Sequence, residues 1–201
     1  MRLAKLLRTF EDEGLLLLSD AKLPSVVALA AGEPVAGSWW GHPKGRAIYA
    51  MLQEFCAHED VLAVKLVSGK VTFVHRRLWP AFLAVARARE PWQTQGLSRP
   101  ARALLARGDA EGEVRASGAA VKELERRLLV HTEEIHTEGG AHAFVAKSWE
   151  RWRRGRGWIG RSPPLERAKR ELGQALERLN ERHDAAGRLP FESPATRRPL
   201  H

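Results

Sequence analysis

The spacing of apolar residues changes from a helical to a strand period within residues 38–79. Apolar side chains recur every three or four positions in residues 47–55, which predicts an amphipathic helix. β-Branched residues then dominate residues 61–67 and 71–74, and a short polar turn separates the two runs. We therefore expect a helix followed by a β-hairpin, with one face of the hairpin apolar enough to cover the helix.

Shorter elements are predicted before this stretch. Residues 3–10 have the spacing of an amphipathic helix that ends near Gly14. The apolar run 15–18 is either a buried strand or a continuation of that helix. A second helix begins at Pro24 and ends at Gly32. The first part of the chain thus reads as helix, short strand, two helices and a hairpin, followed by a further helix.

A similar order of elements returns in the second half of the chain. Residues 91–97 break the apolar spacing and contain Pro91 and Gly96, which favours a linker. After them, the pattern predicts helix, strand, helix and hairpin, one helix fewer than before. The predicted organisation is a first module at 1–90, a linker at 91–97, a second module at 98–146, a basic segment with an amphipathic helix at 147–187, and a disordered tail at 188–201.

The order of elements in residues 1–90 resembles that of winged-helix DNA-binding proteins, a helix-turn-helix variant in which the hairpin forms the wing. The resemblance implies an α+β fold of tandem winged-helix-like modules with a basic helical C-terminal extension. It also implies a recognition helix that begins with Lys44 and Arg46, and a wing whose tip is Lys70. The chain departs from the family at residues 32–43, a long connection with two tryptophans where the family has a tight turn.

The composition is that of a folded protein. Of 201 residues, 44% are hydrophobic and 28% are charged, which is ordinary for a globular domain and argues against wholesale disorder. The single cysteine, Cys56, excludes an internal disulfide, and its place on the predicted helix favours a buried structural thiol. The N-terminal segment turns acidic by Glu11, and no apolar run reaches the ~18 residues of a membrane span. We therefore expect a cytoplasmic protein with no membrane partner.

Positive charge is concentrated behind the hairpin. The net charge is +9; residues 1–75 hold 8 Lys+Arg and 8 Asp+Glu, whereas residues 76–201 hold 25 and 16. Nucleic acid is the polyanion that such a surface most commonly meets in the cytosol. A positive charge of this size also fits a role in solubility, an acidic protein partner or a membrane surface.

Residues 147–170 carry the densest positive charge, with 9 Lys+Arg against 2 Asp+Glu and three interleaved tryptophans. Arginine pairs with phosphate and an indole stacks on a base, so we expect this segment to contact nucleic acid. The alternative is a solvated basic edge whose tryptophans complete the core. Trp39 and Trp40 have two similar interpretations. They form either an exposed platform that stacks on bases or wedges between base steps, or a pair of rings in the core. The predicted nucleic-acid-binding residues are Lys44, Arg46, Lys70, Arg76, Arg77, Lys122, Arg126, Lys147, Arg151, Arg153, Arg154, Arg156, Arg161, Trp39 and Trp40.

Candidate catalytic chemistry is sparse. The tripeptide Gln93-Thr94-Gln95 resembles the Gln-x-Gln motif of bacterial tandem winged-helix DNA glycosylases, and the resemblance implies that Gln93 and Gln95 position a water for attack on a glycosidic bond. Serine-hydrolase, phosphate-loop and dinucleotide motifs are absent from the sequence. One group of polar residues could suggest a metal site, but its spacing does not suit one, and we predict neither a metal nor a cofactor. The group consists of His131, Glu133, Glu134, His136 and His142.

We therefore expect a non-enzymatic nucleic-acid-binding protein that binds duplex DNA, with RNA as the alternative polymer. A DNA base-removal repair enzyme that uses Gln93 and Gln95 is the enzymatic alternative. The third alternative is a protein-interaction or oligomerisation module, in which the apolar seam of residues 165–179 pairs with another chain. Docking of that seam on its own chain is the favoured expectation.

Overall fold

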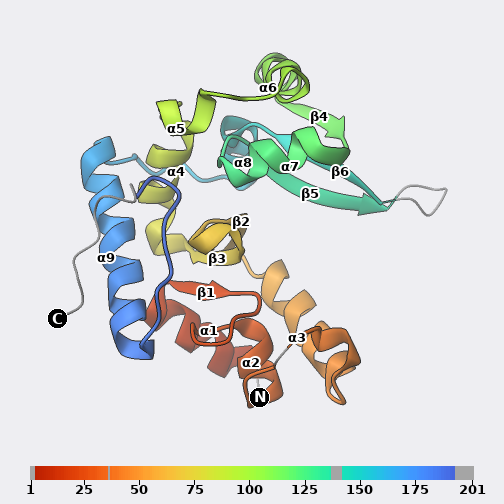
Figure 1. Cartoon of the computed structure of the whole chain (residues 1–201), viewed down its shortest axis with the longest axis vertical. Coiled ribbons are helices and arrows are strands. Elements are labelled where there is room, and N and C mark those ends of the chain that lie inside the picture. Colours follow the sequence, from red (N-terminus) through yellow and green to blue (C-terminus); the bar gives the residue numbers. More distant parts are fainter. Residues whose placement is uncertain (1–2, 36, 137–141, 193–201) are drawn as a thin grey trace. The chain divides into compact units, whose positions relative to one another are not determined.

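The computed structural model describes residues 3–35, 37–136 and 142–192. It contains helices and antiparallel sheets, which confirms the predicted α+β class (Figure 1). The chain divides into two compact units. The first joins the residues up to Arg77 with those from Gly173 onward, and the second runs from Leu78 to Leu172.

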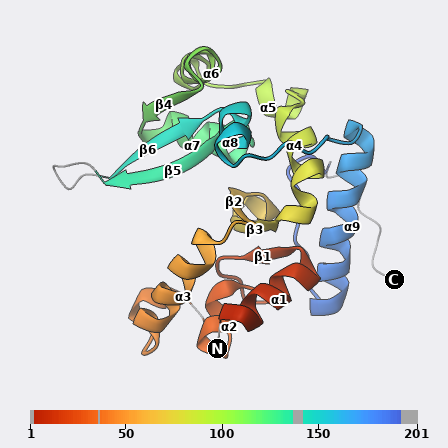
Figure 2. The ribbon, with the colours of Figure 1, turned by 180° about the vertical axis from the view of Figure 1, so that it is seen from behind.

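The first unit follows the element order predicted for the N-terminal part of the chain. Its elements are α1 (Leu3–Glu13), β1 (Leu15–Leu17), α2 (Val26–Ala31), the 3-10 turn η1 (Trp39–Gly41), α3 (Gly45–Ala57), β2 (Val61–Lys65), the 3-10 turn η2 (Val67–Gly69) and β3 (Val71–His75). The strands are antiparallel in the order β1-β3-β2. Most of the apolar run after Gly14 is a strand, because β1 pairs with β3 (Figure 2). The three leucines of β1 are buried.

The helices of the first unit pack their apolar stripes against its sheet. Phe55 of α3 lies edge to face with Phe10 of α1 and Phe73 of β3, at centroid distances of 5.0 and 5.1 Å. All three rings are buried, and burial stabilises the fold by roughly 1.5–3 kcal/mol per ring relative to exposure. This packing fixes α3 along one side and leaves its opposite side to solvent.

The hairpin between β2 and β3 turns at Ser68 and Gly69. Both residues have left-handed backbone angles, with φ of 52° and 69°, and the Lys70 N–H donates to the Val67 carbonyl at 2.9 Å. These are the features of a type I′ turn, whose twist matches that of antiparallel strands. Glycine is well suited to the second position because it has no Cβ to clash at positive φ.

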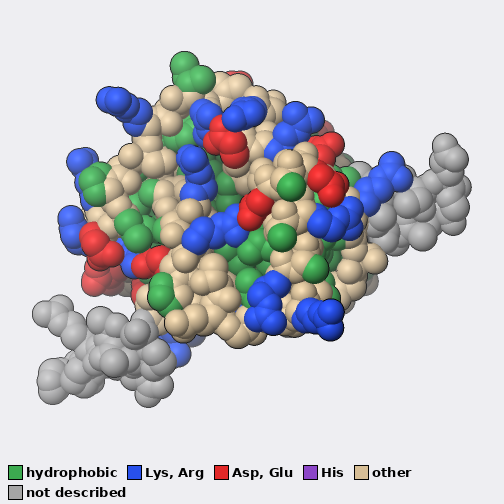
Figure 3. All heavy atoms as spheres, turned by 90° about the horizontal axis from the view of Figure 1, so that it is seen from above, with side chains coloured by type: hydrophobic (Ala, Val, Ile, Leu, Met, Phe, Trp, Pro, Cys, Tyr) green, Lys and Arg blue, Asp and Glu red, His purple; other side chains and the backbone are tan. Residues whose placement is uncertain are grey.

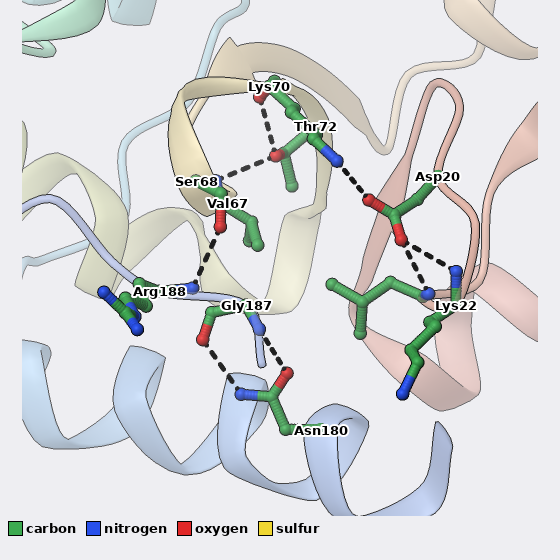
Figure 4. A network of polar contacts seen from close by, with 10 residues as sticks. Asp20, Lys22, Val67, Ser68, Lys70, Thr72, Asn180, Gly187 and Arg188 are labelled. Carbon is green, nitrogen blue, oxygen red and sulfur yellow. Dashed lines mark hydrogen bonds and ion pairs between the residues drawn. The ribbon is translucent and has the colours of Figure 1, made fainter. Parts of the chain in front are cut away.

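The C-terminal part of the first unit covers this turn. Helix α9 (Leu165–His183) begins in the second unit and ends in the first. After it, the Arg188 carbonyl accepts from the Ser68 N–H at 2.8 Å, and the Arg188 N–H donates to Ser68 Oγ at 3.2 Å (Figure 4). Leu189 is buried, so the prediction of disorder is wrong for residues 188–192. The rest of the predicted tail lies outside the described residues.

The second unit also follows its predicted order. Its elements are α4 (Trp79–Arg87), α5 (Pro91–Thr94), α6 (Arg99–Glu111), β4 (Glu113–Ala116), α7 (Gly118–Arg126), β5 (His131–His136), β6 (His142–Lys147) and α8 (Trp149–Gly155), preceded by the short turn η3 (Arg76–Leu78). The strands are antiparallel in the order β4-β6-β5. The run α6, β4, α7 and hairpin thus repeats the first unit with one helix fewer.

The boundaries of the two units differ from those expected. Helix α4 groups with the second unit because Phe82 packs edge to face on Trp149 and Trp79 packs on Trp152, at 5.0 and 5.1 Å. Residues 91–97 do not form a free linker, because they contain α5 and a leucine that is buried in the core of the second unit.

The apolar seam of α9 is buried within the chain. This burial confirms the favoured expectation that the seam docks on its own chain. Among the helices of the described residues, none combines the length and apolarity that a bilayer span needs. The buried seam residues are Ala168, Leu172, Ala175, Leu176 and Leu179.

Candidate functional site

Most of the predicted nucleic-acid-binding cations have partners within the chain. Lys44 donates to the carbonyl of Ala31, and Arg77 donates to that of Asp12. Figure 3 shows acidic side chains among the blue Lys and Arg side chains on one face. The pairs with carboxylates are Lys70 with Asp20 at 2.6 Å, Lys147 with Glu133 at 2.6 Å, Arg151 with Glu113 at 3.4 Å, Arg153 and Arg154 with Glu150 at 2.8 and 2.9 Å, and Arg76 with Asp60 at 3.6 Å.

The tryptophans of the basic segment build the second unit. Trp149, Trp152 and Trp158 are all buried, so the expectation that they stack on bases is wrong and they complete the core. Arg156 lies over the Trp152 ring, with its guanidinium carbon 5.9 Å from the ring centroid. The alternation of arginine and tryptophan therefore reflects one side of α8 turned inward and the other turned to water.

Glu150 gathers three arginines around one carboxylate. In addition to Arg153 and Arg154, Arg87 of α4 lies 3.6 Å from it. The hydrogen bond from Arg153 lowers the pKa of Glu150 most, burial raises it in part, and Arg154 lowers it further, to about 2. The carboxylate is therefore ionised at neutral pH and offsets one of the three positive charges around it.

The Gln93 side chain is enclosed and fully engaged. Its Oε1 accepts from the Glu90 N–H at 3.0 Å, and its Nε2 donates to the carbonyls of Ala86 and Arg127, both at 3.2 Å. Its exposed fraction is 0%, whereas Gln95 is exposed. Positioning a water at a sugar requires a free polar group that solvent can reach. Gln93 thus has the geometry of a structural residue and not of a catalytic glutamine.

His131 is buried against two tryptophans. Its ring lies 5.9 Å from Trp149 and 5.8 Å from Trp152, and its Nδ1 lies 3.7 Å from Glu133. Burial lowers the pKa of the imidazole to about 4, although Glu133 acts in the opposite direction. Among the residues that the structure describes, no three metal-ligating side chains converge. The side chains of Glu134, His136 and His142 lie outside the described residues.

The exposed side of α3 is a different kind of surface. Arg46, Ala50, Gln53 and Ala57 recur at three- and four-residue steps opposite the buried stripe, and all four are exposed. The first turn of α3 carries no acidic side chain, and Arg46 has no acidic partner among the described residues. Gln53 was missed in the sequence, although its place opposite the apolar stripe was a signal that could have identified it.

Two residues near this surface differ in role from the prediction. Lys44 is not available to an external ligand, because its ammonium group donates to the carbonyl of Ala31, the last residue of α2. This hydrogen bond connects α2 to the start of α3. Cys56 is exposed, so the expectation of a buried thiol is wrong. The reason is geometric, because the residue after the buried Phe55 is rotated off the apolar stripe.

Trp39 and Trp40 divide into one core ring and one surface ring. Trp39 is 8% exposed and packs with Ile48, whereas Trp40 is 67% exposed. The two rings are stacked, with centroids 4.1 Å apart and planes 23° from parallel. Tyr49 of α3, which is 46% exposed, lies 5.7 Å from Trp40. We call Trp40 and Tyr49 the aromatic ledge; it adjoins the exposed side of α3.

Helix α7 of the second unit carries further available cations. Lys122 and Arg126 are exposed one turn apart. Arg161, beyond α8, is also exposed. In the part of the chain that the structure describes, these three and Arg46 are the predicted cations without a partner.

Comparisons of this chain with protein-family models, curated proteins and solved structures found no match.

Proposed function

We propose that this protein binds duplex DNA and that the exposed side of α3 enters the major groove. One observation carries the proposal: α3 is packed along one side, while its other side presents Arg46 and Gln53 to solvent. Arg46 has no acidic partner among the described residues, so its charge remains available to a phosphate or a base.

The element order of the first unit supports this proposal. Its order of helix, strand, two helices and two strands is the one on which the resemblance to winged-helix proteins rests. The helix before the hairpin is then the recognition helix, and here it is α3. Helix α7 takes the corresponding place in the shorter second unit.

The side chains of α3 suit base edges. The major groove is about 12 Å wide and admits an α-helix. Arginine forms paired hydrogen bonds with guanine and glutamine does so with adenine. Arg46 and Gln53 lie two turns apart on the same side of α3, and the small Ala50 between them permits close approach of the helix to the bases.

In this proposal the hairpin contributes less to DNA binding than the free wing of a winged helix would. Its turn is hydrogen bonded to Arg188, and Lys70 is paired with Asp20. Burial alone would raise the pKa of Asp20, but hydrogen bonds from Lys70, Lys22 and Leu23 lower it overall, so the carboxylate is ionised at neutral pH. The second unit has exposed cations of its own on α7, Lys122 and Arg126, for phosphate contacts that are independent of sequence.

Fluorescence anisotropy of a labelled DNA duplex over a salt series tests the proposal. The double variant Arg46→Ala/Gln53→Ala should weaken binding at least about tenfold and reduce the salt slope by about one. Arg8→Ala is the matched control, because Arg8 is an exposed cation on α1 of the same unit. Equal affinities of the double variant and the control would refute the assignment to α3. Absence of duplex binding at low salt would refute the function itself.

A further inference from the structure

The aromatic ledge is the main exposed apolar feature of the first unit. Among the described residues, the large hydrophobic side chains that are exposed are Trp40, Tyr49 and Ile159, and the first two lie side by side. Single exposed hydrophobic residues are ordinary in soluble proteins, but adjacent exposed aromatic rings beside a polar helix mark a contact surface. The ledge is therefore suited to contact a partner that presents a flat apolar group.

The ring of Trp40 is held in place before any partner arrives. Trp39 is anchored in the core and covers one face of the Trp40 ring by stacking. The Trp39 carbonyl accepts from the His42 N–H at 3.1 Å, and the His42 carbonyl accepts from the Gly45 N–H at 2.7 Å. A Cβ at Gly45 would lie 3.2 Å from the Trp40 carbonyl oxygen, so α3 and the turn η1 are in direct contact. A ring fixed in this way loses little conformational entropy on binding.

The open face of Trp40 matches the face of a nucleobase. In an intact duplex both faces of each base are already stacked, and only the edges are accessible in the grooves. An unpaired base can turn a face outward, and aromatic side chains stack on such bases without regard to sequence. Arg46 stands one turn before Tyr49 on α3, so the ledge lies directly beside the side of α3 that is proposed to enter the groove.

We propose that the aromatic ledge stacks on an unpaired base, so that the preferred substrate of this protein is duplex DNA that contains a bulged nucleotide. This inference rests on the proposed DNA binding by α3 and adds a substrate class to it. This inference also accounts for the long connection between α2 and α3, because the connection places Trp40 next to the helix that is proposed to enter the groove.

Two labelled probes of the same sequence test the inference, one an intact duplex and the other carrying a single-nucleotide bulge. Wild-type protein should bind the bulged probe more tightly. Trp40→Ala should weaken binding to the bulged probe by about 5- to 100-fold and leave the intact probe nearly unchanged. Trp40→Phe should retain most of the preference because it keeps a ring. Ile159→Ala is the control for an exposed apolar residue elsewhere in the chain.

The outcomes separate this inference from the function beneath it. Equal wild-type affinity for the two probes would overturn the bulge preference and leave duplex binding intact. An equal loss on both probes in Trp40→Ala would also overturn it, since the ring would then act on paired DNA. Failure of the wild-type protein to bind either probe would overturn the proposed function together with this inference.

Discussion

The side-chain amide of Asn180 forms two hydrogen bonds with the backbone of Gly187. Asn180 Oδ1 accepts from the Gly187 N–H at 2.8 Å, and Nδ2 donates to the Gly187 carbonyl at 3.0 Å (Figure 4). This clamp turns the chain back after α9 and brings Arg188 to the hairpin turn at Ser68. The cover of the hairpin thus depends on one asparagine in the last turn of α9 as well as on apolar burial.

Loss of this clamp should destabilise the first unit. We expect Asn180→Ala to lower the free energy of unfolding by about 1–3 kcal/mol, because two partly buried backbone groups lose their partner. Urea unfolding followed by circular dichroism measures the change. Gln174→Ala, at an exposed position of the same helix, is the control and should shift the midpoint little. Identical midpoints for both variants would show that the clamp does not contribute.

Gly187 should tolerate no side chain. A Cβ there would lie 2.9 Å from Val67, 3.0 Å from Leu23 and 3.1 Å from Leu176. Gly187→Ala should therefore lower the free energy of unfolding by about 1–3 kcal/mol through overpacking. Gly173→Ala is a control of opposite sign, because a Cβ at this helical position of α9 meets nothing within 4 Å and should stabilise the helix by about 0.5–1 kcal/mol. A stable Gly187→Ala variant would contradict this packing.

Stability should fall in acid through His131. Burial lowers the pKa of its imidazole from 6.5 to about 4, with Glu133 opposing this and Lys147 and Arg156 adding to it. The unfolded chain therefore binds the proton first, so stability is complete above pH 6.5 and declines as the pH falls toward about 4, by a total on the order of 3 kcal/mol.

Thermal unfolding from pH 8 to pH 4 checks this expectation. His131→Phe keeps a ring against Trp149 and Trp152 but cannot take up a proton. The variant should lose less stability than the wild-type protein between pH 6.5 and pH 4. Parallel pH profiles for the two proteins would show that His131 does not control the acid response.

Gln93 should contribute to the stability of the fold and not to catalysis. Gln93→Ala removes three hydrogen bonds at a buried position and should cost about 2 kcal/mol of unfolding free energy. Gln95→Ala changes an exposed side chain and should shift stability by less than about 0.5 kcal/mol. Chemical unfolding of both variants measures the contrast. A Gln93→Ala protein as stable as the wild type would contradict the structural role of this side chain.

Local patterns predicted the elements well. The apolar stripes of α1 and α3 and the β-branched runs of β2 and β3 lie where the sequence placed them. The hairpin turn also agrees, because Ser68 and Gly69 adopt the positive φ angles that such short connections require. The prediction of a linker at residues 91–97 was wrong. The proline and polar residues that suggested a break in structure instead begin a short helix with a capping box.

The candidate site was only partly predictable. Arg46 and Trp40 were identified from their residue types, and both are exposed. Lys70 was assigned to the same role, but it pairs with an aspartate 50 residues away in the sequence. Trp39 was grouped with its neighbour, although one ring is buried and the other is not.

By itself, the sequence determined the order of helices, strands and turns, because apolar period, caps and turn residues act over a few neighbouring positions. Only the tertiary structure decided which charges and rings remain available. Trp152 is buried because it meets Trp79 from a distant part of the chain, and α9 is covered because residues far apart in the sequence pack together. Exposure depends on such long-range partners, so two adjacent tryptophans of the same residue type were separated into a core ring, Trp39, and a surface ring, Trp40, only by the packing of the folded chain.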